Sequence, residues 1–244
     1  MPIFEYDPQI LAAVATMPAS ISDVIRTMQT IDGLCVDVDG LKWFNRLYLQ
    51  VTVAVAARNA AGGFRDPSWM MELDIQFAEL YFGALRTALS GGRAAGCWRA
   101  MLDRRGMIAV ARIQFALAGV NAHINHDLPL AIGATCRIRG LAPSHALMQY
   151  AEYTSINDTL NTLVDDAKRE LAVRLPGDEL PAVSNLEETV AAFSVSAARE
   201  AAWNNSEMLW AISSFPLLRD RALNSLDGLT AVAGKTLLVP VPLA

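Results

Sequence analysis

Hydrophobic residues recur at helical spacing along almost the whole chain, and this periodicity limits the possible folds more than any other feature. No stretch alternates between apolar and polar residues over enough positions to form a β-sheet. Hydrophobic residues make up 53% of the 244 residues and charged residues only 18%, so much of the chain must be buried. We therefore predict an all-α fold, with one domain over residues 1–244 built from about 8–10 helices around a central buried helix.

Capping residues, glycines and prolines set the expected bounds of the helices. We expect helices at about 8–17, 20–30, 41–58, 67–89, 94–103, 107–128, 144–153, 156–174, 184–213 and 216–226. The 41–58 helix is apolar on nearly all sides between Leu47 and Ala57, so we expect it at the centre of the bundle. The chain should be irregular from Pro129 to Pro143, and the tail at about 230–244 should be extended. The core should span about 20–215.

Charge, hydropathy and cysteine content argue against several classes of protein. The net charge of −5 leaves no basic surface for nucleic acid. No apolar run reaches the roughly 20 residues of a membrane span, and the N-terminus has neither the basic nor the apolar region of a signal peptide. The three cysteines are widely spaced, which favours reduced, buried thiols and a cytoplasmic location.

The predicted 107–128 helix carries the densest polar cluster of the chain, the sequence NAHINHDLP at residues 121–129. Successive helical residues lie about 100° apart, which divides the polar side chains into two stripes. The stripes are Gln114, Asn121 and Asn125 on one side, and Arg112, His123, His126 and Asp127 on the other. A regular helix cannot direct both stripes into one pocket. Pro129 clashes with the carbonyl of the residue four before it, so we expect a kink that could bring the stripes together.

His123, His126 and Asp127 share one helix face because they lie three or four residues apart. This spacing suits two metal ligands, or a histidine that a carboxylate orients for proton transfer. The alternative is a helix end that these side chains only cap and solvate. We do not expect a closed zinc site, because His145 is the only other histidine.

Two charged residues lie on apolar faces of other predicted helices. Asp74 stands opposite the solvent-facing side of its helix, beside Phe77 and Tyr81, and either braces a neighbouring segment or serves a site. Arg199 lies in a stripe with Trp203. It can stack on an aromatic ring, pair with an inward carboxylate such as Asp74, or bind an anionic substrate group.

Several of these motifs together resemble an uncharacterised, mainly bacterial family known only as a domain of unknown function. The resembling residues are Phe44, Asn45, Leu47, Tyr48, Asp74, Phe77, Tyr81, Gln114, Phe115, the 121–129 segment, Arg199 and Trp203. The likeness covers roughly residues 20–215, and the 121–129 motif is its most specific part. The resemblance implies a shared fold and site and supplies no activity.

A second stretch, NDTLNTLVD at residues 157–165, is similar in spacing to the second metal motif of class I terpene synthases. That resemblance implies Asn157, Asn161 and Asp165 as ligands of a Mg²⁺ ion that binds a diphosphate. Asn161 replaces the Ser or Thr of that motif, Asp165 replaces its Glu, and no DDxxD-type motif precedes it. The same stretch is also typical of a solvated helix face, so both interpretations stay open.

We expect an enzyme of the lyase, isomerase or cyclase type, acting in an apolar helical cavity on a hydrophobic small molecule such as a prenyl diphosphate or another natural-product intermediate. The expected catalytic residues are His123, Asp127, His126 and Asp74, and the expected substrate-binding residues are Asn45, Tyr48, Tyr81, Gln114, Asn121, Asn125, Arg199 and Trp203. One alternative is a metal-dependent hydrolase or oxygenase that uses His123 and Asp127. Another is a non-enzymatic binding or scaffold protein with a structural hydrogen-bond cluster at 121–129. A homo-oligomer is compatible with all three.

Overall fold

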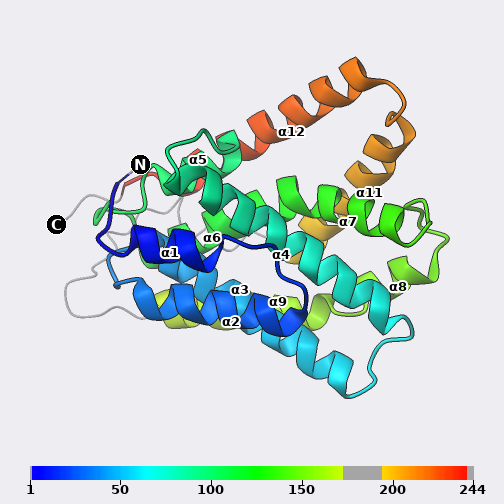
Figure 1. Ribbon diagram of the computed structural model, residues 1–244, viewed down its shortest axis with the longest axis horizontal. Helices are drawn as coiled ribbons and strands as arrows, with labels where there is room; N and C mark the ends of the chain where they lie inside the picture. The colour runs from blue at the N-terminus through cyan, green and yellow to red at the C-terminus, as the bar shows by residue number, and fades with distance from the viewer. Residues whose placement is uncertain (1, 173–193, 241–244) are drawn as a thin grey trace.

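The computed structural model describes residues 2–172 and 194–240, and over these residues the chain forms helices and no strand, as predicted (Figure 1). The first half contains α1 (Asp7–Ala13), α2 (Ile21–Leu34), α3 (Gly40–Ala60), α4 (Pro67–Leu89), α5 (Gly96–Leu102) and α6 (Arg112–Ala122). A π-helical turn, η1 (His123–Asp127), then leads into α7 (Leu128–Ile138), α8 (Met148–Thr154), α9 (Asn157–Ala172), α11 (Val195–Ala211) and α12 (Pro216–Leu237). Within the described ranges, no helix combines the length and apolarity needed to cross a membrane.

Local signals fix several helix bounds where the sequence predicts them. The side chains of Ser20, Asp39 and Asp66 accept hydrogen bonds from the first-turn amides of α2, α3 and α4. Gly62 and Gly91 follow α3 and α4 at φ values of 71° and 81°, in the left-handed region that favours glycine. The helix start expected at residue 184 lies outside the described residues, and Ser194 caps α11.

The centre of the bundle is α6, not α3. Every residue from Ile113 to Ala122 is buried, and α6 packs against α3, α5 and α12. The expectation that the 41–58 helix is central was wrong for its second half, where only Thr52 and Val55 are buried. Only one side of that half is buried, and Val53 is 44% exposed.

Small residues let α3 and α6 pack closely. A Cβ added at Gly119 would lie 2.3 Å from the ring of Phe44, and one added at Gly40 would lie 2.3 Å from the ring of Phe115. Each helix therefore inserts an aromatic ring against a glycine of the other. The contact at Gly119 places Phe44 beside the polar cluster that follows α6.

A widened turn precedes Pro129. In η1 the amide of Leu128 donates to the carbonyl of His123, five residues back, as in a π-helix. Pro129 then falls in the first turn of α7, where a missing amide hydrogen costs little. The expectation of irregular chain after Pro129 was therefore wrong as far as Ile138, where α7 ends.

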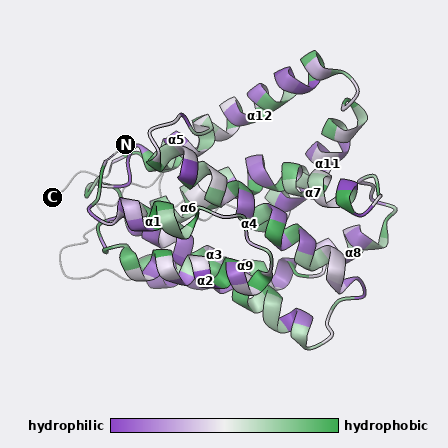
Figure 2. Cartoon of the chain, viewed as in Figure 1, coloured by the Kyte–Doolittle hydropathy of each residue, from purple (hydrophilic) through white to green (hydrophobic). Residues whose placement is uncertain are grey.

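α12 extends well beyond its expected end at 226. Its first half projects from the body of the molecule with exposed Leu217 and Leu218, and its length mixes hydrophobic and hydrophilic residues (Figures 1 and 2). Its second half buries Thr230, Ala231 and Leu237, and α12 packs against α5 and α6. The expected extended tail from about 230 was therefore wrong as far as Leu237, because these positions keep helical spacing.

A buried ionic cluster joins the N-terminal segment to the core. Arg105 is fully buried between α5 and α6, and its Nε donates to Asp39 Oδ1 at 2.8 Å. Its Nη1 lies 2.9 Å from Asp7 Oδ1, and the Tyr6 hydroxyl donates to Asp39 Oδ2 at 2.8 Å. Because Asp7 and Asp39 stand at the starts of α1 and α3, one guanidinium connects both helix starts to the α5–α6 loop.

Candidate functional site

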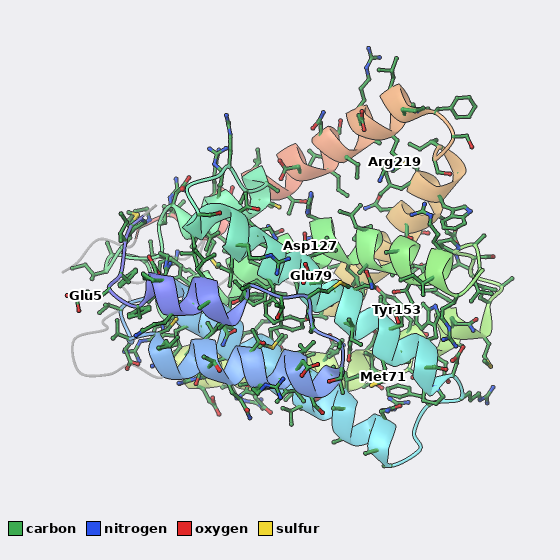
Figure 3. The ribbon with its side chains drawn as sticks, viewed as in Figure 1. Glu5, Met71, Glu79, Asp127, Tyr153 and Arg219 are labelled. Carbon is green, nitrogen blue, oxygen red and sulfur yellow. The ribbon has the colours of Figure 1, made fainter. Side chains whose placement is uncertain are left out.

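The π-turn gathers the polar cluster around one buried carboxylate, that of Asp127, which lies in the interior of the bundle (Figure 3). His123 Nδ1 lies 3.1 Å from Asp127 Oδ2, which also accepts from Trp98 Nε1 at 2.9 Å. His126 Nδ1 lies 2.7 Å from Asp127 Oδ1. Since a carboxylate only accepts, each histidine donates its Nδ1–H to it, and Nε2 of a neutral His123 keeps its lone pair.

Burial and the shared carboxylate set the charges of this cluster. Burial lowers the pKa of His123, and the hydrogen bond and charge of Asp127 only partly oppose it. Burial would raise the pKa of Asp127, but hydrogen bonds from the two histidines outweigh it and lower that pKa. Burial would also lower the pKa of His126, but the Asp127 contact raises it. His123 is therefore neutral beside an ionised carboxylate, which is the state of a general base.

Aromatic rings hold the His123 side chain in place. The imidazole stacks on Phe77 with ring centroids 3.5 Å apart, and the Tyr48 ring lies 4.4 Å away in an edge contact. Phe44 and Trp98 complete the enclosure at centroid distances of 5.6 and 5.9 Å. The ring therefore has little freedom to rotate, so the direction of its Nε2 is fixed.

A small cavity of about 60 Å³ adjoins this imidazole. Apolar side chains from α3, α4, α6, α9 and α11 line it, together with His123, Tyr48 and Arg199. His123 Nε2 and the Tyr48 hydroxyl are buried and have no hydrogen-bond partner. Buried polar groups in native proteins are almost always satisfied, so two unpaired groups on one cavity need an explanation such as a bound molecule.

Arg199 supplies a buried positive charge to the same cavity. Its Nε donates to Asn157 Oδ1 at 2.8 Å, its Nη2 donates to the Tyr153 carbonyl at 2.6 Å, and its guanidinium lies 3.9 Å from the Tyr153 ring centroid. None of the ion pairs found within residues 2–172 and 194–240 includes Arg199. Burial lowers its pKa, and the charge of Asp74 only partly opposes this effect. A buried cation with no carboxylate within ion-pair distance can bind an anion.

Asp74 on α4 provides a second carboxyl group near the site, after Asp127. Its Oδ2 is shielded from solvent without a hydrogen-bond partner. Burial raises the pKa of Asp74 to about 7, although the charge of Arg199 opposes the rise. Burial raises the pKa of the nearby Tyr48 hydroxyl, and the charge of Asp74 raises it further. Asp74 therefore titrates near neutral pH at the edge of the site.

We expect Asp74→Asn to remove a pH dependence of stability. The folded pKa of about 7 lies above the ordinary 3.8, so the folded state binds more protons and the free energy of unfolding falls as pH rises between these values. Relative to the wild type, the variant should gain about 1–4 kcal/mol as the pH rises from 4 to 7, and the gain should level off above about pH 8. Urea unfolding from pH 4 to pH 8 measures this. The exposed Asp165→Asn serves as control, and equal profiles for Asp74→Asn and the wild type would contradict the prediction.

Several predicted substrate-binding residues lie away from the cavity and join helices instead. Asn45 donates to the Met28 carbonyl at 2.9 Å and accepts from the Tyr81 hydroxyl at 3.2 Å, which links α3 to α2 and α4. Trp203 donates to Glu207 Oε1 at 3.1 Å. These contacts use the polar atoms that a substrate would need.

The asparagine stripe of the central helix faces α12. Gln114 Nε2 donates to the carbonyls of Leu237 and Val239 at 2.8 Å each. Asn121 Nδ2 donates to the Thr230 carbonyl at 2.9 Å, and Asn125 donates to Asn121 Oδ1 at 3.0 Å. The two stripes therefore face different neighbours. Gln114, Asn121, His123 and Asp127 are buried, whereas Arg112, Asn125 and His126 are partly exposed.

The predicted magnesium ligands receive no support from their surroundings. Asn157 Oδ1 accepts from the cationic Arg199, and Asn161 donates to the Ser196 hydroxyl at 2.9 Å. Asp165 lies at the surface, 3.2 Å from Lys168. A guanidinium at the first ligand position would repel a divalent cation.

Trp98 is the site residue that the sequence analysis missed. It is buried on the short helix α5 and supplies one of three hydrogen bonds to Asp127. A tryptophan in a seven-residue helix gives no periodic signal. Its need for an indole N–H acceptor was the one available clue.

Comparison with known proteins places the chain in a family without assigning a function. No curated protein and no solved structure matches the chain. The model of a family of unknown function matches residues 21–240, which include the 121–129 motif and every helix from α2 to α12. The chain therefore belongs to DUF5995, a family of unknown function.

Proposed function

We propose that the protein is an acid–base enzyme of the lyase or isomerase type, acting on a small, largely apolar molecule with an anionic end. The observation that carries the proposal is that His123, whose buried Nε2 has no hydrogen-bond partner, and the buried Arg199 both line the same small cavity. A base and an anion-binding residue that line one apolar cavity provide the minimum for proton transfer next to a carboxylate.

The proposed chemistry follows from the orientation of these groups. His123 Nε2 accepts a proton from a substrate carbon, and the electron pair of that C–H bond forms a carbon–carbon double bond as a leaving group departs from the next carbon with its own pair. In an isomerisation, the same proton returns to a different carbon. Asp127 stabilises the imidazolium that forms. The Tyr48 hydroxyl is available to donate to the developing anion.

The volume of the cavity limits the size of the substrate. A cavity of roughly 150 Å³ holds benzene, and this one has about 60 Å³. It has room for the reacting end of a small acid, and a prenyl diphosphate is far larger. The proposal therefore keeps the reaction type expected from the sequence and replaces the prenyl substrate with a small carboxylic acid.

Deuterium exchange tests the proton transfer even while the natural substrate is unidentified. The protein is incubated in D₂O with a panel of small aliphatic carboxylic acids, saturated and unsaturated, and proton NMR follows exchange at carbon. We expect the wild type to catalyse exchange for at least one acid. His123→Gln should lower that rate at least about 100-fold, the usual contribution of a positioned base. Arg199→Leu should raise the acid concentration needed for half-maximal exchange.

The third histidine provides a matched control. His145 lies at the surface, 2.7 Å from Glu207 and 3.1 Å from Glu200, so His145→Gln should keep the wild-type rate. Equal exchange rates in His123→Gln and the wild type would remove His123 from the mechanism. Absence of exchange with every acid in the panel would count against the proposed reaction class.

A further inference from the structure

Three side chains from separate helical elements meet beside the cluster around Asp127. They are Cys97 on α5, His126 on η1 and Asp227 on α12, and their ligand atoms all lie within 4.8 Å of one another. No other group of three or more His, Cys, Asp or Glu side chains within residues 2–172 and 194–240 meets this condition. The proposed reaction at His123 uses none of the three.

Hydrogen bonds hold two of these side chains in position. Asp227 accepts from the backbone amides of Cys97 and Gly96, at 2.8 and 2.9 Å, through its two oxygens. His126 Nδ1 is engaged by Asp127 at 2.7 Å, so Nε2 is the ring nitrogen that remains for a ligand. A carboxylate behind a histidine is the arrangement that commonly orients metal-ligating histidines in proteins.

We propose that Cys97, His126 and Asp227 bind a Zn²⁺ ion. A thiolate, an imidazole and a carboxylate together suit zinc, whereas Mg²⁺ and Ca²⁺ prefer oxygen ligands alone. Three protein ligands leave a fourth tetrahedral position for water. Cys97 is buried and the other two are partly exposed, so the ion can enter from the solvent. Only the histidine of this set belonged to the polar cluster recognised in the sequence.

The ion would share Asp127 with the candidate base. Asp127 Oδ1 contacts His126 and Oδ2 contacts His123, so one carboxylate orients both the proposed ligand and the proposed base. The zinc proposal nevertheless does not depend on the proposed reaction, because it concerns different side chains and its test measures metal binding.

Cobalt titration of the full-length protein tests the site. Chelator-treated protein is titrated with Co²⁺, which reports a thiolate ligand through a charge-transfer band in the near ultraviolet, and Zn²⁺ is then added as competitor. We expect one Co²⁺ per chain with this band, displaced by one equivalent of Zn²⁺. Cys97→Ser should abolish the band. Asp227→Asn should keep the thiolate band but weaken binding at least about 10-fold, and Asp127→Asn should weaken it about 10–100-fold by loosening His126.

A second buried cysteine gives a matched control. Cys136 on α7 is as buried as Cys97, so Cys136→Ser should bind Co²⁺ like the wild type. The site would be refuted if the wild type shows no thiolate band, or if Cys97→Ser keeps it. Circular dichroism establishes that each variant is folded, and if Cys97→Ser does not fold, the band in Asp227→Asn and its weakened affinity decide the question. Absence of any bound ion would leave a metal-free contact in which the Cys97 thiol hydrogen-bonds Asp227.

Discussion

Replacement of Asp127 by alanine is expected to lower the free energy of unfolding by about 3–5 kcal/mol, among the largest effects of any single substitution in this chain. Asp127 accepts hydrogen bonds from Trp98, His123 and His126. Its loss leaves the buried N–H groups of Trp98 and His123 and the part-buried N–H of His126 without an acceptor, and each buried unpaired group costs about 1–3 kcal/mol. Urea unfolding in the presence of a chelator measures the effect free of any bound metal.

The isosteric Asp127→Asn separates the charge from the hydrogen bonds. Its amide keeps one acceptor oxygen, so we expect a loss of about half that of Asp127→Ala. Trp98→Phe removes only one donor to the carboxylate, and it should cost about 1–2 kcal/mol. A loss below about 1 kcal/mol for Asp127→Ala would show that Asp127 does not organise the cluster.

Arg105→Ala should have a comparable effect, about 3–5 kcal/mol, at the ionic cluster that joins the N-terminal segment to the core. Arg105 is fully buried, and its removal leaves the buried carboxylates of Asp7 and Asp39 without their cation. These groups hold the starts of α1 and α3. We therefore expect the N-terminal residues to exchange amide hydrogens faster than the rest of the chain, as well as a lower urea midpoint.

Arg104 offers a neighbouring control for this prediction. It is part-buried and donates to the Ala100 carbonyl at 3.1 Å, and the structure gives it no carboxylate partner among the described ion pairs. Arg104→Ala should change the free energy of unfolding by about 0.5 kcal/mol or less. Equal losses for the two variants would mean that the buried ionic cluster adds nothing beyond an ordinary surface arginine.

The helices were predictable because their signals are local. The caps at Ser20, Asp39 and Asp66 and the proline at the start of α4 lie within one turn of the positions that they define. The choice of the central helix was not local. α3 and α6 each contain a glycine against which the other packs an aromatic ring, and which of the two the other helices surround depends on the whole bundle.

The candidate site was also predictable only where its contacts are local in sequence. The four-residue spacing of His123 and Asp127 identified their contact, because both belong to one turn. Trp98, Cys97 and Asp227 come from segments that the sequence gives no reason to place beside that turn. The helix expected at 216–226 even ended before Asp227, so that carboxylate was assigned to no element.

The wide turn at His123–Asp127 also limits the insertions and deletions that this segment can accept. A π-turn holds one residue more than the α-turn that it replaces. Deletion of one residue here would let an ordinary α-turn form with little rotation of α7, but it would change the spacing that brings His123 and His126 onto the carboxylate of Asp127. This segment can therefore accept many substitutions more readily than a change of length, and the distance in sequence from His123 to Pro129 should stay fixed among functional variants.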